Sequence, residues 1–417
     1  MDTSGGPARD AALVLTGVTL TDLAFRVSQV ALPLLVLTGT GSTAATGVVA
    51  GVTGVPVLLS PWWARRLRHH LSDGRRLAAC SLVGTGGQVV VATWATTHAR
   101  AWWPLVVGGL VLGSAQALTD PGRDALVADL GDGLPGVDRA VGLLSARELG
   151  RRIGMVLGPV LGGLGVTAGH AVVLLWGEVG AGVAAAALVA SVRPATPGPV
   201  GAGPPPRVRP LLRERPDVLA GWVVRGTGCL LWFSFTIGLT VLGVRQGRPG
   251  TVLAVGLTGY GAGSVAGALL TLPLLRRVAP LPAVATAWGV TGLAWVTIGL
   301  TTGTPSGTAV LAAAAATSGV GIAVGNAGVT AQVVRSSRGA DRRALLAGQS
   351  ALVQATGSLG SFVGGSVVGG VGPVATLGTA GVVLVVTAVV TPTLGRRRAP
   401  RATPPVAARS CAREGGS

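Results

Sequence analysis

Two residues in one apolar stretch of the sequence have the types and spacing needed for proton transfer. Asp22 and Arg26 lie four residues apart, so a carboxylate and a guanidinium can pair on one face of a helix. A charge at the centre of a bilayer costs about 2.5–3.5 kcal/mol on insertion scales, so each such residue needs a partner or a purpose. Two interpretations follow. Asp22 takes up a proton and releases Arg26, or the two form a permanent structural salt bridge.

Glu178 is a second candidate, because it lies in an apolar segment close to Trp176 with no basic residue nearby in the sequence. A carboxyl group in such surroundings is suited to carrying a proton. The alternative is a structural role, with a hydroxyl group or a lipid headgroup as its partner. Glu148 differs, since Arg151 and Arg152 follow it at the spacing of a helical ion pair, which predicts a structural contact.

Several other residues in apolar segments could line a path for a solute. Arg225 could face such a path opposite Asp22, or its side chain could extend to the membrane surface. Amide groups could line the path or bridge helices, and aromatic rings could offer a stacking surface to a bulky solute, with ordinary helix packing as the alternative. The candidates for this path are Gln116, Arg225, Trp232, Phe235, Asn326, Gln332 and Gln354.

A glycine-rich stretch predicts a helix that packs closely and bends. Its special residues are Gly154, Gly158, Pro159, Gly162 and Gly163. Glycines at every fourth position form a bare stripe that another helix backbone can approach. Pro159 has no N–H to donate to the carbonyl of Met155, which loosens the helix at that turn. We interpret this stretch as a conformational hinge motif.

The elements that carry these residues are those of a membrane protein. The mean hydropathy is +0.62 and only 12% of the residues are charged. The net charge of +18 comes from arginines that lie mainly between the apolar segments, which indicates membrane topology and contact with anionic lipid rather than nucleic acid. Neither the cysteines nor the histidines have metal-site spacing, and we expect no metal, no cofactor and no enzyme activity.

Hydropathy predicts an all-α membrane protein with twelve transmembrane helices in two six-helix halves. The first six spans are expected near 11–38, 44–64, 76–97, 101–119, 142–168 and 170–191, and the second six near 219–244, 251–275, 282–302, 306–333, 344–368 and 372–394. The predicted divisions are an N-terminal bundle over 1–193, a proline-rich linker over 194–216, a C-terminal bundle over 217–395 and a basic tail over 396–417. Alternate connections carry the arginines, which places the linker, the tail and both termini in the cytoplasm.

The two halves repeat one another. Asp138-Arg139 before the fifth span matches Asp341-Arg342 before the eleventh, and residues 158–163 match residues 360–365 with Ser361 in the place of Pro159. Parallel repeats of this kind place a substrate path between the halves, and alternating access follows when one half rocks against the other.

Local patterns add a family resemblance. They are Asp22-x3-Arg26, Ala31-Leu32-Pro33-Leu34-Leu35-Val36, Asp120-Pro121-Gly122-Arg123 with the residues up to Leu130, and the glycine stretch of the fifth span. In combination they resemble the major facilitator superfamily, drug/proton antiporter type, and are most similar to its macrolide and siderophore exporter branch. Three features depart from that pattern: the connection over 60–76 lacks the usual glycine and acid, the fourth span has no arginine, and Ser361 replaces the second-half proline.

The resemblance implies a proton-coupled exporter of a small amphipathic organic molecule of the drug, antibiotic or siderophore class. It further implies a monomer in a bacterial cytoplasmic membrane, with protons and the lipid bilayer as its other partners. Two alternatives are a nutrient importer of the same fold, and a non-transporting or lipid-scrambling protein that has lost proton coupling. The altered connection over 60–76 and the arginine-free fourth span are the features that favour this last alternative.

Overall fold

Helices form nearly all of the computed structural model, which describes residues 6–64, 67, 74–97, 101–132, 134, 139–192, 208–301, 307–337 and 339–397. Ten of the described helical segments are long and apolar enough to cross a membrane. The fourth and fifth predicted spans correspond to α6 and α7, which carry more polar and charged residues and pack among the others. The chain is therefore a multi-pass membrane protein, and its twelve-span count stays a prediction.

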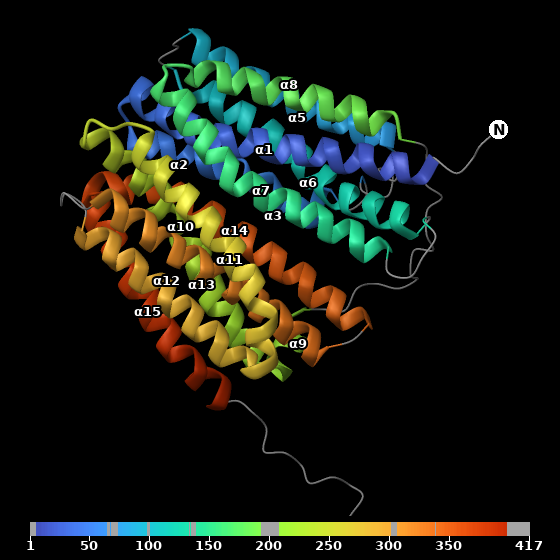
Figure 1. The fold of residues 1–417 in the computed structure, drawn as a ribbon, viewed down its shortest axis with the longest axis vertical. Helices are drawn as coiled ribbons and strands as arrows, with labels where there is room; N and C mark the ends of the chain where they lie inside the picture. The colour runs from blue at the N-terminus through green and yellow to red at the C-terminus, as the bar shows by residue number, and fades with distance from the viewer. Residues whose placement is uncertain are drawn as a thin grey trace, which may run out of the picture.

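The first half of the chain folds into one bundle, drawn in blue to green in Figure 1. Its helices are α1 (Gly6–Thr40), α2 (Thr43–Val52), α3 (Gly54–Trp63), α5 (Gly74–Thr97), α6 (Trp103–Asp132), α7 (Arg139–Thr167) and α8 (Ala171–Ala190). Helix α1 packs against α7 and α8, and α5 packs against α6 and α8.

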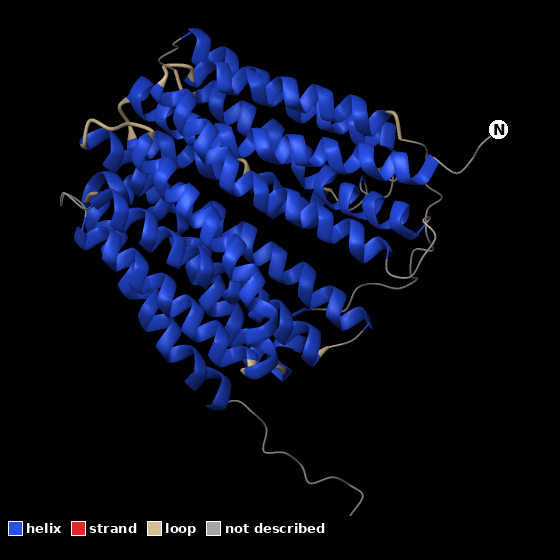
Figure 2. Cartoon of the chain, viewed as in Figure 1, coloured by secondary structure: helices blue, strands red, loops and turns tan. Residues whose placement is uncertain are grey.

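The second half forms the other bundle, drawn in yellow-green to red. Its helices are α9 (Val208–Glu214), α10 (Pro216–Arg245), α11 (Thr251–Arg277), α12 (Pro280–Thr301), α13 (Gly307–Ser336), α14 (Gly339–Val371) and α15 (Pro373–Arg397). The helices of both bundles run side by side, and short loops join most of them in the part of the chain that is described (Figure 2).

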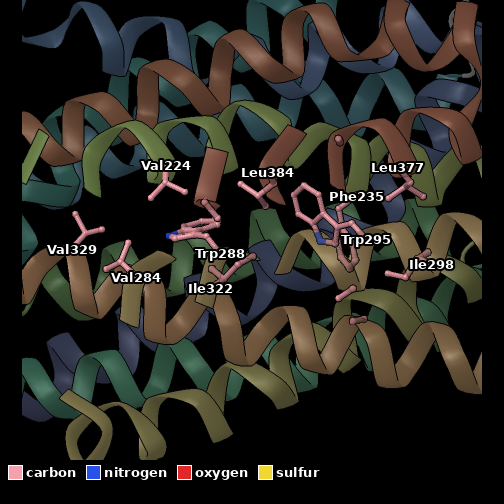
Figure 3. Packing of buried hydrophobic residues seen from close by; sticks show 14 of the residues in the cluster. Val224, Phe235, Val284, Trp288, Trp295, Ile298, Ile322, Val329, Leu377 and Leu384 are labelled. Atoms are coloured by element: carbon pink, nitrogen blue, oxygen red, sulfur yellow. The ribbon is translucent and has the colours of Figure 1, made fainter. Parts of the chain in front are cut away.

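The second bundle has the larger apolar core (Figure 3). Trp288 and Trp295 of α12 are buried there with Phe235 of α10 and Leu384 of α15. The Trp295 indole N–H donates to the hydroxyl of Ser318 at 3.0 Å, so its one polar atom is satisfied inside the apolar core.

Two helical segments differ from the sequence prediction. The expected second span is broken between α2 and α3 at Thr53, because Pro56 has no N–H to donate to the carbonyl of Val52. The expected linker over 194–216 contains α9 as a short helix. Leu211 of α9 is buried in the core of the second bundle, and this apolar contact explains why a helix forms after the prolines. Residues 193–207 of the linker and 398–417 of the tail lie outside the described part of the chain.

The bundles touch along two seams near one end. Helix α2 packs against α14, and α7 packs against α11. A Cβ atom at Gly47 would lie only 2.6 Å from the backbone nitrogen of Gly365, so glycine is needed where these backbones meet. In the second seam Arg152 of α7 donates to the backbone carbonyl of Ser264 at 3.0 Å. The ribbons diverge from these seams toward the end that carries the N-terminus (Figure 1).

A central cavity between the two bundles

A cavity of about 550 Å³ lies between the bundles. Most of its wall comes from the first bundle, through α1, α2, α3, α5, α6, α7 and α8, and the second bundle adds residues of α10 and α14. Its polar and charged side chains include Asp22, Arg26, Gln29, Gln88, Gln116, Asp120, Arg123, Arg147, Arg151, Glu178 and Gln354. The cavity is therefore a polar chamber inside an otherwise apolar molecule.

Asp22 lies on this wall within a group of arginines. Arg147 exerts the largest electrostatic influence on its carboxylate, followed by Arg26, Arg151 and Arg123. The predicted interaction of Asp22 with Arg26 is thus one interaction in a wider cluster of residues that come from α1, α6 and α7. Protonation of Asp22 would change the balance of charge in all three helices, because each contributes an arginine to that cluster.

Arg26 also lies on the cavity wall, one helical turn beyond Asp22. Its Nη1 donates to the side-chain oxygen of Gln29 at 3.1 Å, and its guanidinium lies 5.5 Å from the centre of the Phe25 ring. A guanidinium has five N–H donors, so Arg26 can contact other groups as well as Gln29.

Glu178 lines the cavity from α8, in the part of the wall formed with α5 and α1. The Gln88 side-chain amide donates to its carboxyl oxygen at 2.9 Å, and the Ser28 hydroxyl is close enough to interact with it. Its partner is thus an amide ninety positions earlier in the sequence, rather than a headgroup. Neutral groups surround this acid, whereas arginines surround Asp22.

The second bundle contributes an aromatic surface. Trp232 of α10 lies on the cavity wall and its ring centroid is 5.1 Å from that of Phe235 and 4.9 Å from that of Tyr260. Trp295 lies 6.2 Å behind it. This packing holds the Trp232 ring in place, so that it can receive a planar or apolar part of a solute.

The predicted path residues divide into two groups. Gln116, Trp232 and Gln354 line the cavity, as do Asp22, Arg26 and Glu178. The others are not among its lining residues. Phe235 is fully buried behind Trp232, Gln332 is buried against Gly221 of α10, and Asn326 lies on α13 with its side chain partly buried.

Arg225 lies beside the cavity rather than on its described wall. It is close enough to Arg151 of the first bundle and to Cys229 for electrostatic interaction. Its Nε and Nη1 atoms are buried and have no hydrogen-bond partner among the described residues. Much of the guanidinium is therefore held inside the protein, near the opposite bundle.

The glycine stripe of α7 faces its own bundle. Cβ atoms at Gly154, Gly158 and Gly162 would meet Leu23, Arg26 and Val27 of α1, respectively. Pro159 is buried, and Gly163 on the adjacent face lies against Ala254 of α11. The stripe thus fixes the distance between α1 and α7, while the neighbouring face of α7 forms the seam with the second bundle. Whether this stretch acts as a hinge stays a prediction.

Three further arginines line the cavity beyond those predicted to do so. Arg123 was expected in a connection and Arg151 in a structural pair, while Arg147 had no assigned role. Helix α6 continues past the predicted end of its span, which carries Arg123 to the wall, where it donates to the Ser81 hydroxyl at 3.0 Å. Arg147 and Arg151 share a helix face with Gly154 and Gly158, and this spacing was a usable signal. The side chain of Glu148 lies outside the described residues.

A model of the family described as Major Facilitator Superfamily matches residues 14–307 of the chain. A search among curated proteins finds no significant match.

Solved structures that superpose on this chain include transporters. A variant of the nucleoside transporter NupG superposes with a TM-score of 0.68 and 14% identity over 93% of this chain and 99% of its own. A bacterial homologue of the human lysosomal transporter Spinster, in an inward-facing and unoccupied conformation, superposes with a TM-score of 0.68 and 12% identity, over 94% of this chain and 97% of its own. A POT family transporter in complex with a thioalcohol-conjugated peptide superposes with a TM-score of 0.65 and 12% identity, over 94% of this chain and 97% of its own. At these identities the likeness concerns the fold.

Proposed function

Because the chain belongs to the major facilitator superfamily, we propose that it exports a small amphipathic organic molecule in exchange for protons. Alternating access between the two bundles would carry the molecule across a bacterial cytoplasmic membrane, with the protein acting as a monomer and both termini in the cytoplasm. In that orientation the diverging end of the bundles faces the cytoplasm, where a molecule to be exported would enter.

One observation carries this proposal: two carboxyl groups in different surroundings face the same cavity. Asp22 interacts with arginines, so its protonation state sets the charge that those arginines present to a bound molecule. Glu178 is hydrogen-bonded to the Gln88 amide, so it can hold a proton without the release of a cation. An acid near bound cargo and a second acid in the same cavity provide the groups that proton exchange requires.

The contacts between the bundles are the part of the molecule that must change during transport. The contacts of α2 with α14 and of α7 with α11 close one end of the cavity. Transport requires these contacts to separate while the diverging ends approach one another, because the cavity must open to each side in turn. The glycine backbones at the α2–α14 seam allow close contact without side chains that interlock, which suits a contact that must form and break.

The test is transport into everted membrane vesicles that hold the protein and have an acidified interior. We expect uptake of cargo when the interior is acidified, and its loss when a protonophore removes the gradient. Candidate cargo comes from a panel of antibiotics and siderophores whose toxicity or uptake changes in a deletion strain.

Two variants, Asp22→Asn and Glu178→Gln, separate coupling from binding. Each keeps the shape of the side chain but cannot exchange a proton, so we expect gradient-driven uptake to fall to the level of vesicles without the protein. Ser191→Ala, on an exposed residue at the end of α8, serves as the control. Full activity of the double variant would overturn coupling through these acids. Uptake by intact cells with growth on the solute would instead identify an importer.

A further inference from the structure

The charges around the cavity indicate the chemical class of the cargo, an inference that rests on the proposed transport function. The described lining residues include four arginines and three carboxylic acids. Glu178 is hydrogen-bonded to an amide, so the arginine cluster itself contains two acids, Asp22 and Asp120. A guanidinium offers five N–H donors, so an arginine in such a cluster can contact a carboxylate of the protein and an acidic group of a ligand at the same time.

Arginines from both bundles lie at this place. Arg151 of α7 lines the cavity, and Arg225 of α10 lies close enough to repel it electrostatically. The Nε and Nη1 groups of Arg225 are buried without a hydrogen-bond partner among the described residues. Like charges that lie near each other in a low-dielectric interior are costly unless a negative group lies between them, and so are the unpartnered donors of Arg225.

An aromatic surface lies next to these cations. Tyr260 interacts electrostatically with Arg26 and Arg151 across the bundle interface, and its ring packs against Trp232 at 4.9 Å. Trp232 itself lines the cavity. A single molecule can therefore contact arginines with one end and the indole ring with its body.

We propose that the cargo is an organic anion whose acidic group binds between Arg151 and Arg225. Its apolar or planar part packs on Trp232. A carboxylate, sulfonate or phosphate group can accept hydrogen bonds from two guanidinium groups at once. Because the two arginines belong to different bundles, the bound anion replaces their repulsion with attraction and draws the diverging ends together. Occupancy thus favours the closure that alternating access requires.

Equilibrium binding to the purified full-length protein in nanodiscs tests the proposal independently of transport. The probes are 2-naphthoate, 2-naphthamide and 2-naphthylmethylamine at neutral pH, which share one ring system and carry a negative, neutral or positive group. We expect naphthoate to bind at least about tenfold more tightly than naphthamide, and the amine to bind most weakly. Empty nanodiscs correct for partition into lipid.

Variants locate the binding site. Arg225→Gln and Arg151→Gln should each remove most of the preference for naphthoate and leave naphthamide binding unchanged. Arg225→Lys keeps the charge and should retain part of the preference. Trp232→Leu should weaken all three probes. Arg245→Gln, an exposed arginine at the far end of α10, is the matched control and should not change binding. A folded preparation is identified by a single size-exclusion peak.

The outcomes separate the two proposals. Equal affinities, absence of binding by all three probes, or a preference that survives in both Arg151→Gln and Arg225→Gln would overturn the anion site. If the protein binds the anion but the vesicles show no acid-driven uptake, the anion-site proposal stands and the proposal of proton-coupled export is wrong. If the protein takes up a cationic or neutral cargo, and neither Arg151→Gln nor Arg225→Gln changes that uptake, the transport proposal stands and the anion-site proposal is wrong.

Discussion

Among the individual residues, Glu178 is an ionisable group with a neutral hydrogen-bond partner. The bond from Gln88 to Glu178 joins α5 to α8 at the wall of the cavity. A double-mutant cycle with Gln88→Leu and Glu178→Leu should give a coupling energy of about 0.6 kcal/mol, the average for such bonds in a membrane protein, where the largest reach about 1.7 kcal/mol. Reversible unfolding in mixed micelles measures it. Additive single-variant effects would show that the two groups do not stabilise each other.

A second residue-scale prediction concerns the core of the other bundle. Ser318→Ala removes the acceptor of the buried Trp295 indole N–H and should lower the free energy of unfolding by about 1–3 kcal/mol. The same change in a Trp295→Phe background should cost much less, because no donor is left unsatisfied. Thermal unfolding in detergent compares the four proteins. An equal cost in both backgrounds would mean that Ser318 acts through packing rather than through its hydroxyl.

At the scale of elements, the seam between α2 and α14 depends on glycine. Gly47→Ala places a methyl group against the backbone of Gly365, so the substitution should weaken the closed end and favour the opposite opening. Spin labels at Ala168 and Gln246, both exposed at the closed end, should move apart. Electron–electron double resonance measures the distance after replacement of the native cysteines.

The matched control for this seam is Gly177→Ala. It adds the same methyl group to a helix, but nothing lies within 4 Å of the new atom. The gain of about 0.5–1 kcal/mol in helix propensity is common to both variants, so only the contact differs. If the labels report the same distance in both variants, the seam is not a determinant of the conformational equilibrium.

Hydropathy and helix spacing predicted much of the fold but only part of the cavity. They gave the order of the helices, because apolar length determines where a chain crosses a bilayer. The sequence patterns did not predict the break of the second span at Thr53, although Pro56 was a signal for it. They also did not predict that α6 continues to Arg123. The partnership of Glu178 with Gln88 was beyond reach, since it depends on how α5 packs against α8. The sequence could not show that Trp232 lines the cavity while Phe235 is buried behind it, because burial behind a neighbour depends on how the bundle packs.

At the scale of the whole molecule, the seams close one end of the cavity, and the distribution of arginine predicts which side of the membrane that end faces. Arg276, Arg277, Arg335 and Arg342 lie at helix ends on the diverging side, whereas the closed end that holds Gln246 carries Arg245 and Arg248. Lipid-surface charge and the insertion machinery favour arginine on the cytoplasmic side. A cysteine in place of Gln246 should therefore react with a membrane-impermeant thiol reagent in intact cells. A cysteine in place of Arg276 should react only in everted vesicles. The reverse labelling pattern would place the open end outside the cell, and a molecule bound in this conformation would then have entered from the exterior, against the proposed direction of transport.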